Sequence, residues 1–465
     1  MGQLIPKGGK IGWFGALAQG LGTNAPAGVT ALYFVGIASM VGADLPLLVL
    51  LAFLVYLGMT LIVYEWSKIV SSSYSWVAIQ KKGYNSSFMA FTAGWTYFFY
   101  YFIPIFAFAM IGEAAFIEFL SPSLAVKFPY IWIVIVIVMT IEVSIFVWYG
   151  IKPNLKYVLV TGIAEITFLI IASLIIIVKA GALNTPTVFT LSPIHGNTSA
   201  LFIALVLSIT TFGGLNSVIP LGEETKNAKK NIPKALIVLA GLLAAPLILS
   251  SYAETIGFGV SNMASFAVSP DPGLIVFEKF LGVIGFGLLA IFVINSFNSA
   301  MITDVNSSIR MTFGLSRDNV VFPKVFRELN KHGQPGKAGI ITVVVNAILA
   351  IVLGLIMGPL VAGTFMIIWF SFYSYLNHAL AGGGLIIYHK KHGTLKVLTH
   401  VVVPVIIIIT LIAAIFYSVY PSLPAEPYTL APVFAFLWIV IGWVIYFYLK
   451  KKDPEKMAKF GDSSF

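Results

Sequence analysis

Charged side chains are scarce in this chain of 465 residues. Asp, Glu, Lys and Arg together make up 10% of it, whereas hydrophobic residues make up 59%. Soluble domains carry roughly 25% charged and 45–50% apolar residues on average. Because so few charges cannot cover the surface of a water-soluble protein of this length, the composition excludes a soluble enzyme.

Cysteine is absent altogether, which excludes disulfides, thiol nucleophiles, iron–sulfur clusters and zinc held by thiolates. The six histidines do not have the spacing of a metal site. The sequence also contains no phosphate-binding loop, GxSxG turn or paired catalytic carboxylates. We therefore expect no enzymatic activity, no resident metal and no cofactor, with a proton or a sodium ion as the coupling ion.

Long apolar runs dominate the rest of the chain. A membrane-spanning helix requires about 20 mostly apolar residues, and twelve such runs are present. They leave no room for a soluble domain, so the sequence predicts an all-α membrane protein. The expected spans cover roughly residues 11–42, 44–68, 87–120, 129–149, 154–179, 199–225, 233–258, 281–312, 338–357, 360–389, 397–419 and 429–450.

The basic residues predict how these spans are oriented. The net charge is +10, and every Lys and Arg except Lys127, Lys179 and Lys279 falls on one side of a twelve-span topology that starts in the cytoplasm. Cytoplasmic loops are enriched in Lys and Arg. We therefore expect a multi-pass protein of the plasma membrane, surrounded by the lipid bilayer, with both termini cytoplasmic. The positive charge then requires no nucleic-acid partner.

The first expected span is interrupted at its centre, where residues 20–28 read GLGTNAPAG. Pro26 lacks an N–H group and clashes with the carbonyl one turn earlier. It also disfavours helical geometry at Ala25. Such an interruption is either a simple kink or a binding site.

The sixth expected span has a similar interruption, because Gly213 and Gly214 lie in its middle and Pro220 follows. Glycines alone could serve close packing between helices. Each interruption, however, falls in the first helix of a block of five spans, and an odd number of spans inverts the second block relative to the first. Paired broken helices in inverted repeats indicate a transporter binding site.

The broken ends predict a site with both polarities. Half-helices that begin near Ala27 and Leu215 offer N–H groups and partial positive charge to a carboxylate. Halves that end near Gly22 and Phe212 offer carbonyls to an ammonium group or a sodium ion. This arrangement fits a zwitterion, of which an α-amino acid is the simplest. The predicted substrate-binding residues are Gly22, Thr23, Asn24, Ala25, Pro26, Ala27, Gly28, Phe212, Gly213, Gly214, Leu215 and Asn216.

Several motifs resemble those of the amino acid–polyamine–organocation (APC) superfamily. They are Phe212-Gly213-Gly214 with 221–227 and 231–235, then Asn306 to Arg310 with Arg317-Asp318 and Phe322-Pro323, and the 42–46 entry into the second span. The resemblance covers nearly the whole chain. It implies a LeuT-like fold, with a five-plus-five inverted repeat and two additional C-terminal helices. It also implies alternating-access transport of amino acids or related amines.

One position departs from the superfamily pattern. Many members carry Phe-Glu after the second glycine of the motif, where this chain has Leu215-Asn216. A neutral amide thus replaces an acid that could pair with a substrate amine. Specificity for cations therefore does not carry over from the resemblance.

Glu165 lies near the centre of the fifth span. An acid there costs about 2.5–3.5 kcal/mol on insertion scales, so it faces a polar cavity or is protonated. We consider it a candidate for ion coupling, with packing as the alternative, and give Glu113 and Glu142 less weight. The resemblance implies that Ser296 and Ser299 are candidates if the ion is sodium. Hydrogen bonding between helices is the alternative for both serines.

Glu223 and Glu224 lie where the sixth span approaches the cytoplasm. They either pair with Lys226 and Lys229 in solvent or form a cytoplasmic gate.

Aromatic residues are also expected along the path. Phe212 is expected to form a wall or gate over the substrate. The aromatic runs 95–102 and 369–375 are expected to face lipid or to pack, with one or two members along the path.

The sequence thus predicts a secondary active transporter that moves an amino acid and is coupled to a proton or sodium gradient. Transport of another amine or a nucleobase-like solute is the alternative, followed by a membrane-embedded enzyme or a nutrient sensor. We expect an N-terminal tail and first repeat in 1–180, a second repeat in 181–395, and two further helices with a cytoplasmic tail in 396–465. The side-chain specificity and the oligomeric state do not follow from the sequence.

Overall fold

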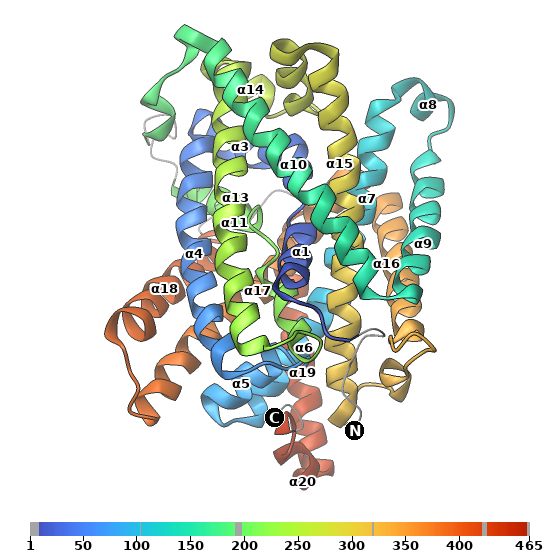
Figure 1. The fold of residues 1–465 in the computed structure, drawn as a ribbon, viewed down its shortest axis with the longest axis vertical. Coiled ribbons are helices and arrows are strands. Elements are labelled where there is room, and N and C mark those ends of the chain that lie inside the picture. Colours follow the sequence, from blue (N-terminus) through green and yellow to red (C-terminus); the bar gives the residue numbers. More distant parts are fainter. Residues whose placement is uncertain (1–8, 103, 191–197, 319, 421–425, 463–465) are drawn as a thin grey trace.

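The computed structural model describes residues 9–102, 104–190, 198–318, 320–420 and 426–462 (Figure 1). All regular secondary structure in these residues is helical. Within them, 11 segments are long and apolar enough to cross a membrane, and the first, Trp13–Ile69, contains both the first and the second expected span. The structure therefore confirms an all-α membrane fold.

The first five expected spans are helical. Their elements are α1 (Trp13–Asn24), α2 (Pro26–Gly28), the π-helical turn η1 (Val29–Tyr33), α3 (Phe34–Val41), α4 (Leu45–Ile69), α6 (Ser87–Phe102), α7 (Pro104–Leu120), α9 (Ile131–Tyr149) and α10 (Ile151–Ala180). Two short helices connect them, α5 (Trp76–Tyr84) and α8 (Pro122–Lys127). The first span is divided into several pieces, as its glycines and proline predicted.

The remaining expected spans are helical as well. Their elements are α11 (Thr198–Thr210), α12 (Leu215–Val218), the 3₁₀ turn η6 (Ile219–Glu223), α13 (Ala228–Phe258), α15 (Pro272–Leu315), α16 (Gly336–Met357), α17 (Pro359–Lys391), the π-helical turn η10 (Leu398–Val402), α18 (Val403–Tyr417) and α19 (Leu430–Lys452). Short helices α14 (Met263–Phe266) and α20 (Pro454–Ala458) complete the described chain. The sixth span is thus divided like the first.

Helix α15 begins before the predicted eighth span, but its backbone is non-helical at Gly282 (φ 69, ψ −167), next to the predicted start near 281. Asp271 precedes α15, and its side chain accepts the N–H of Leu274 at 3.1 Å. Pro272 occupies the first position of the helix, where the missing N–H is not needed. Hydropathy placed the start near 281 because Glu278 and Lys279 interrupt the apolar run.

The two divided spans lie at the centre of the helix bundle. Helix α1 packs against α10, α13 and α15, and α12 contacts α1 (Figure 1). Helices α9 and α18 lie at opposite sides of the molecule in the same view. Their outward side chains include exposed Ile141 and Ile409, which suits contact with lipid.

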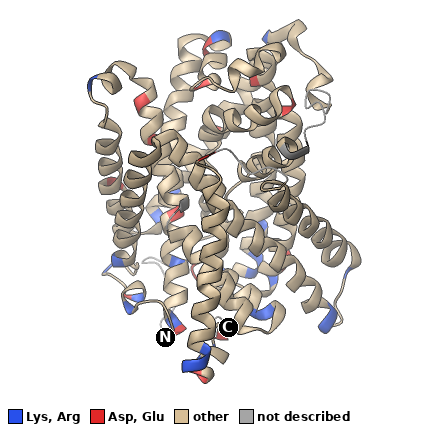
Figure 2. Ribbon diagram, turned by 180° about the vertical axis from the view of Figure 1, so that it is seen from behind, with Lys and Arg blue, Asp and Glu red and all other residues tan. Residues whose placement is uncertain are grey.

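Basic side chains gather at one end of the molecule. Figure 2 shows most Lys and Arg at the lower end, where Figure 1 places α5 and α20. Lys127, which was expected on the opposite side, ends α8, and α8 lies at the upper end in Figure 1. The fold therefore separates the charges in the way that the twelve-span topology predicted.

Candidate functional site

The first span breaks at Ala25. Helix α1 continues to Asn24, past the predicted end near Gly22, and Ala25 has left-handed backbone angles (φ 51, ψ 62) before Pro26 opens α2. A left-handed residue other than glycine costs roughly 1–2 kcal/mol, so other contacts must hold this break. Pro26 sets its position, because proline cannot continue α1 and disfavours helical geometry at the residue before it.

The break in the sixth span touches the first one. Residues 211–214 separate α11 from α12, and Gly214 has a φ of 98. A Cβ at Gly214 would lie 2.2 Å from the carbonyl oxygen of Gly20, so only glycine fits there. The side-chain Nδ2 of Asn24 donates to the carbonyl of Thr211 at 2.8 Å. The two broken spans are therefore joined at their breaks.

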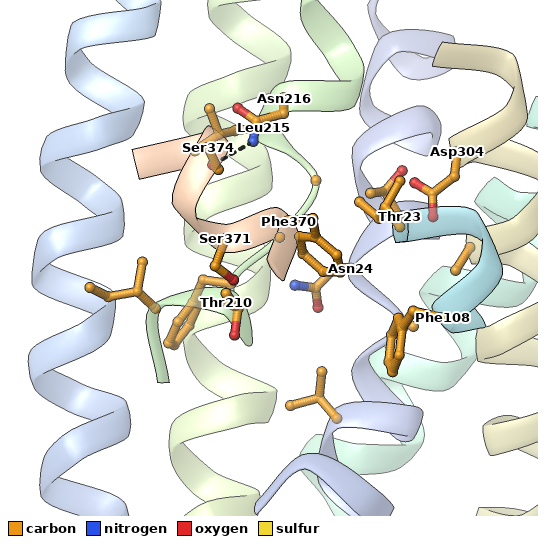
Figure 3. Close-up of a pocket in the computed structure, with 18 of the residues that line it drawn as sticks. Thr23, Asn24, Phe108, Thr210, Leu215, Asn216, Asp304, Phe370, Ser371 and Ser374 are labelled. Atoms are coloured by element: carbon orange, nitrogen blue, oxygen red, sulfur yellow. Dashed lines mark hydrogen bonds between the residues drawn. The ribbon is translucent and has the colours of Figure 1, made fainter. Parts of the chain in front are cut away.

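A pocket lies between the two breaks (Figure 3). Its empty space is about 790 Å³, counting the part that is open to solvent. Three of the predicted binding residues, Gly22, Pro26 and Ala27, are not among the residues that line it. The predicted residues that do line it are Thr23, Asn24, Ala25, Gly28, Phe212, Gly213, Gly214, Leu215 and Asn216.

Glu165 closes the start of α2. Its Oε1 accepts the N–H of Ala27 at 2.7 Å and the hydroxyl of Ser296 at 2.6 Å, and its Oε2 accepts the Nδ2 of Asn295 at 3.2 Å. A carboxylate is favoured at the positive end of a helix. The N–H of Ala27, expected to be open to a substrate carboxylate, is thus bound by a carboxylate of the protein itself.

The two candidate serines of α15 differ in their placement. Ser296 donates to Glu165 and also accepts the N–H of Gly28 at 3.3 Å, so it bridges the fifth span and the first break. The carbonyl of Ser299 accepts the hydroxyl of Thr303 at 2.8 Å. Among the hydrogen bonds of the described residues, none joins Ser299 to Glu165. Of the three ion-coupling candidates, the structure brings together Glu165 and Ser296.

Glu113 and Glu142 lie away from the pocket lining. Glu142 accepts the Nδ2 of Asn298 at 2.9 Å, and Glu113 is buried. The hydroxyl of Tyr157 donates to Asn295 at 2.7 Å. Because Asn295 in turn donates to Glu165, Tyr157 is joined to Glu165 through Asn295. In the described part of the chain, no group of three or more His, Asp or Glu side chains is placed to hold a metal ion.

Glu223 pairs with an arginine beyond the end of α15. Two hydrogen bonds of 2.7 and 2.5 Å join it to Arg317, and its Oε1 also accepts the hydroxyl of Ser73 at 2.7 Å. These contacts contradict the alternative in which Glu223 pairs with Lys226 or Lys229 in solvent. The partner is 94 residues away in the sequence, so charge spacing along the chain could not reveal it.

Glu224 pairs with Arg310 of α15, and both side chains are fully buried. The Arg310 guanidinium also donates to Gln334 at 2.9 Å. Next to this pair, Ile11 donates its N–H to the carbonyl of Glu224 at 2.8 Å and accepts the N–H of Lys226 at 2.8 Å. The N-terminal segment, the end of the sixth span and α15 are thus fastened together at the basic end of the molecule.

Two further cavities continue from the pocket in another direction. Tyr33, Phe108 and Phe297 line both the pocket and the next cavity, which in turn shares Leu32 and Gly36 with a third. Of the shared residues, Leu32 and Tyr33 belong to η1 and Gly36 belongs to α3. Figure 1 places α3 on the side of the molecule away from the basic end. The pocket therefore adjoins further cavities on the side of η1 and α3.

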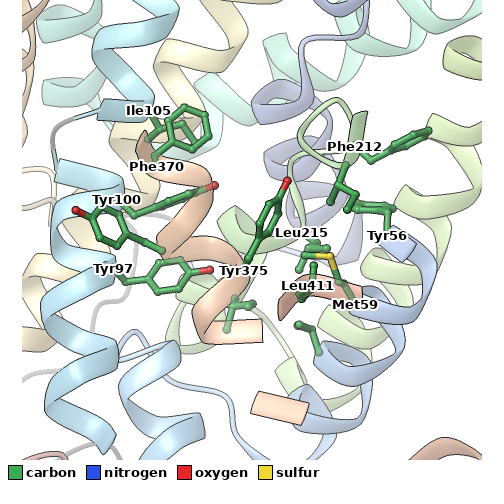
Figure 4. Close-up of a cluster of buried hydrophobic side chains, with 14 of the residues drawn as sticks. Tyr56, Met59, Tyr97, Tyr100, Ile105, Phe212, Leu215, Phe370, Tyr375 and Leu411 are labelled. Carbon is green, nitrogen blue, oxygen red and sulfur yellow. The ribbon is translucent and has the colours of Figure 1, made fainter. Parts of the chain in front are cut away.

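Aromatic side chains form much of the pocket wall (Figure 4). Phe212 packs against Phe53 and Tyr56 with ring centroids 5.6 Å apart, in agreement with its expected role as a wall. The aromatic runs 95–102 and 369–375 mostly pack inside the bundle, which is one of the two expected placements. They contain buried residues, and three members line the pocket: Tyr100, Phe370 and Tyr375.

Two further pocket residues stand out. Asn216 donates its Nδ2 to the hydroxyl of Ser374 at 3.0 Å and to that of Tyr100 at 3.4 Å. Asp304 of α15 also lines the pocket and is 2% exposed. Asp304 was not among the predicted site residues. It could have been found in the same way as Glu165, as an acid inside an apolar span.

Paired broken helices around a central pocket define the chain as a membrane transporter with the LeuT-like fold. The structure of MhsT in complex with L-phenylalanine has a TM-score of 0.59 to this chain, covers 86% of it and 98% of its own chain, and is 13% identical. A mutant of the manganese transporter of Eremococcus coleocola has a TM-score of 0.55, with 96% and 94% covered and 12% identity. At such identities the likeness shows the fold alone.

The family follows from the sequence. The model of the amino acid permease family matches residues 15–459, so the chain belongs to this family of the APC superfamily. Among curated proteins, none matches the chain. The family and the fold neighbours are transporters rather than enzymes, which agrees with the expected absence of enzymatic activity.

Proposed function

We propose that this permease is a secondary active transporter that moves an amino acid across the plasma membrane by alternating access. The observation that carries the proposal is the pocket between the two joined breaks. It combines polar groups from both broken spans with an aromatic wall. A neighbour of the same fold was solved in complex with L-phenylalanine, and the aromatic lining suits an amino acid with an apolar side chain.

The substrate carboxylate is assigned to the start of α12. The corresponding end of α2 is occupied by Glu165, whereas no carboxylate of the described residues is hydrogen-bonded to the start of α12, where the N-cap residue Gly214 has no side chain. The first N–H groups of a helix have no partner within it. Leu215 and Asn216 both line the pocket, so these N–H groups lie beside the bound solute.

Glu165 is assigned to ion coupling, with Ser296 as its partner. Its carboxylate, from the fifth span, accepts one hydrogen bond from the first break at Ala27 and one from the eighth span at Ser296. A change in the charge of Glu165 alters its attraction to the start of α2. Binding of a proton or a sodium ion there thus influences the break that forms one wall of the pocket.

The ion pairs Glu223–Arg317 and Glu224–Arg310 are assigned to a gate. They lie at the basic end, which the enrichment of Lys and Arg assigns to the cytoplasm together with both termini. The structure then represents a state closed to the cytoplasm, and release of substrate to that side requires the pairs to separate. The two inverted repeats that rearrange in this step are placed in 1–180 and 181–395, with 396–465 outside them.

Uptake by reconstituted protein tests the proposal. The purified protein is inserted into liposomes, and uptake of each of the twenty L-amino acids is measured with a proton gradient or a sodium gradient imposed separately. We expect at least one amino acid to accumulate under one of the two gradients. Protein-free liposomes control for leakage.

The failing result is equally clear. If no amino acid accumulates under either gradient and none raises the melting temperature of the purified protein, amino acid transport is excluded. Uptake of an amine or a nucleobase in the same liposomes would then support the alternative substrate classes.

A further inference from the structure

Asp304 occupies an unusual position in the pocket. Of the described residues that line it, Asp304 is the one with a carboxyl group. It is 2% exposed, and Figure 3 shows it beside Thr23 at the first break. None of the ion pairs between described residues includes it. A buried carboxylate without a positive partner is costly, and a cationic ligand in the pocket would remove this cost.

The unpartnered polar atoms of the pocket are all hydrogen-bond acceptors. Among the lining residues, three buried atoms have no hydrogen-bond partner: Oδ1 of Asn24, Oδ1 of Asn216 and Oδ1 of Asp304. The orientation of Asn24 is determined by its neighbour, because its Nδ2 must face the carbonyl of Thr211. The pocket therefore lacks donors to match these oxygens, and a ligand must supply them.

We propose that Asp304 binds the ammonium group of the transported solute and restricts transport to substrates with a free amine. An ammonium group has three donors and no acceptor, which matches the three unpartnered oxygens in kind. Tyr33, Tyr100 and Phe297 also line this pocket, and aromatic rings attract cations. The inference rests on the proposed function and adds the residue that recognises the amine.

Glu165 cannot take this role in the observed arrangement. Its two carboxylate oxygens accept hydrogen bonds from Ala27, Ser296 and Asn295, and it is not among the residues that line the pocket. The two acids of the central region are therefore separated in function. Glu165 faces the start of α2, whereas Asp304 faces the solute.

Binding measured on purified full-length protein in detergent tests the proposal. The probes are the L-amino acid that binds most tightly in a panel of twenty, its N-acetyl derivative and its decarboxylated amine. Wild-type protein is expected to bind the amino acid and to discriminate strongly against the N-acetyl form. Asp304→Asn keeps the shape of the side chain but removes its charge. It should weaken binding of the free amino acid by roughly 30-fold or more, as when one partner of a buried charge pair is removed.

Two variants keep the result interpretable. Asp304→Glu retains the charge and should restore part of the discrimination against the N-acetyl form. Glu254→Gln removes another buried acid, one that does not line the pocket, and should leave the discrimination unchanged. If Asp304→Asn does not fold, Asp304→Ala is measured in its place and should lose the discrimination against the N-acetyl form; full retention of the discrimination in Asp304→Ala would overturn the proposal.

The outcomes separate this proposal from the transport proposal. Unchanged affinity and unchanged discrimination in Asp304→Asn would overturn the role of Asp304 while amino acid binding stands. Binding of the decarboxylated amine in place of every amino acid would overturn the proposed substrate, and its loss in Asp304→Asn would still support Asp304. Repeating the titrations with potassium in place of sodium identifies a sodium site. If Asp304→Asn changes only the sodium dependence, Asp304 binds the metal ion and the proposal is wrong.

Discussion

The two broken spans meet at one pocket, but their half-helices begin in different surroundings. The start of α2 is bound by Glu165 and Ser296, two side chains from other spans. At the start of α12, the N-cap residue Gly214 has no side chain, and Leu215 and Asn216 line the pocket. From the sequence, both starts are predicted to bind a substrate carboxylate, because every broken helix exposes the same kind of N–H groups.

This difference teaches that related breaks can serve separate tasks. An end that is bound by a titratable side chain responds to ions, whereas an open end is available to the solute. Because the breaks are joined by Asn24 and Gly214, a change at the first can reach the second. Coupling of an ion gradient to transport then has a short structural route.

The largest effect is expected where the two breaks touch. Gly214→Ala places a Cβ against the carbonyl of Gly20 at a position with positive φ. Backbone strain and overpacking together should lower the free energy of unfolding by about 3 kcal/mol and abolish substrate binding. Thermal melting and binding titrations measure both effects.

Gly213→Ala is the matched control for this variant. A Cβ at Gly213 would have its nearest neighbour at 3.7 Å, an ordinary contact. We expect it to fold with nearly the stability of the wild type. Equal losses of stability in Gly214→Ala and Gly213→Ala would show that the close contact between Gly214 and Gly20 is not the cause of the loss.

The next effect concerns the bound end alone. Glu165→Gln keeps an acceptor for the N–H of Ala27 but removes the charge, so gradient-driven uptake should fall by about tenfold or more, in the range of typical coupling energies. Substrate binding without a gradient should change much less. Uptake in liposomes with imposed proton or sodium gradients measures the first quantity. Retention of both gradient dependences in Glu165→Gln would remove the distinction between the two ends.

The two serines of α15 refine the comparison further. Ser296→Ala removes one hydrogen bond to Glu165 and another to the N–H of Gly28. A lost hydrogen bond to a charged group corresponds to about 2 kcal/mol, so the ion dependence of uptake should shift measurably. Ser299→Ala should shift it less if the ion is a proton. Equal shifts in a sodium gradient would instead place both serines at a sodium site, as the family resemblance implied.

The smallest effect is expected at the open end. Asn216→Ala removes the hydrogen bonds to Ser374 and Tyr100, each of which corresponds to about 1 kcal/mol at most. Affinity for the substrate should fall about fivefold, with no change in ion dependence. A changed ion dependence in Asn216→Ala would mean that the open end also takes part in coupling.

The sequence predicted most of the fold because a membrane-spanning helix requires a long apolar run, which is visible in the sequence. Apolar runs located the spans, basic residues separated the two ends, and Pro26 and Gly214 marked the breaks. The predicted start of the eighth span near 281 coincides with the non-helical Gly282, although a further helical segment that contains Glu278 and Lys279 precedes it in α15. The pocket was predicted in part, since most of the predicted substrate-binding residues at the two breaks line it.

What the sequence determined by itself was a membrane transporter with two interrupted spans and a few costly acids. Only the tertiary structure decided which acid meets which partner. Glu165 lies 138 residues from Ala27, and Glu224 lies 86 residues from Arg310. Partners this distant are chosen by the packing of helices against one another, which no local pattern records. The physical reason is general: hydropathy is a property of each segment, whereas a binding site is a property of the segments that meet.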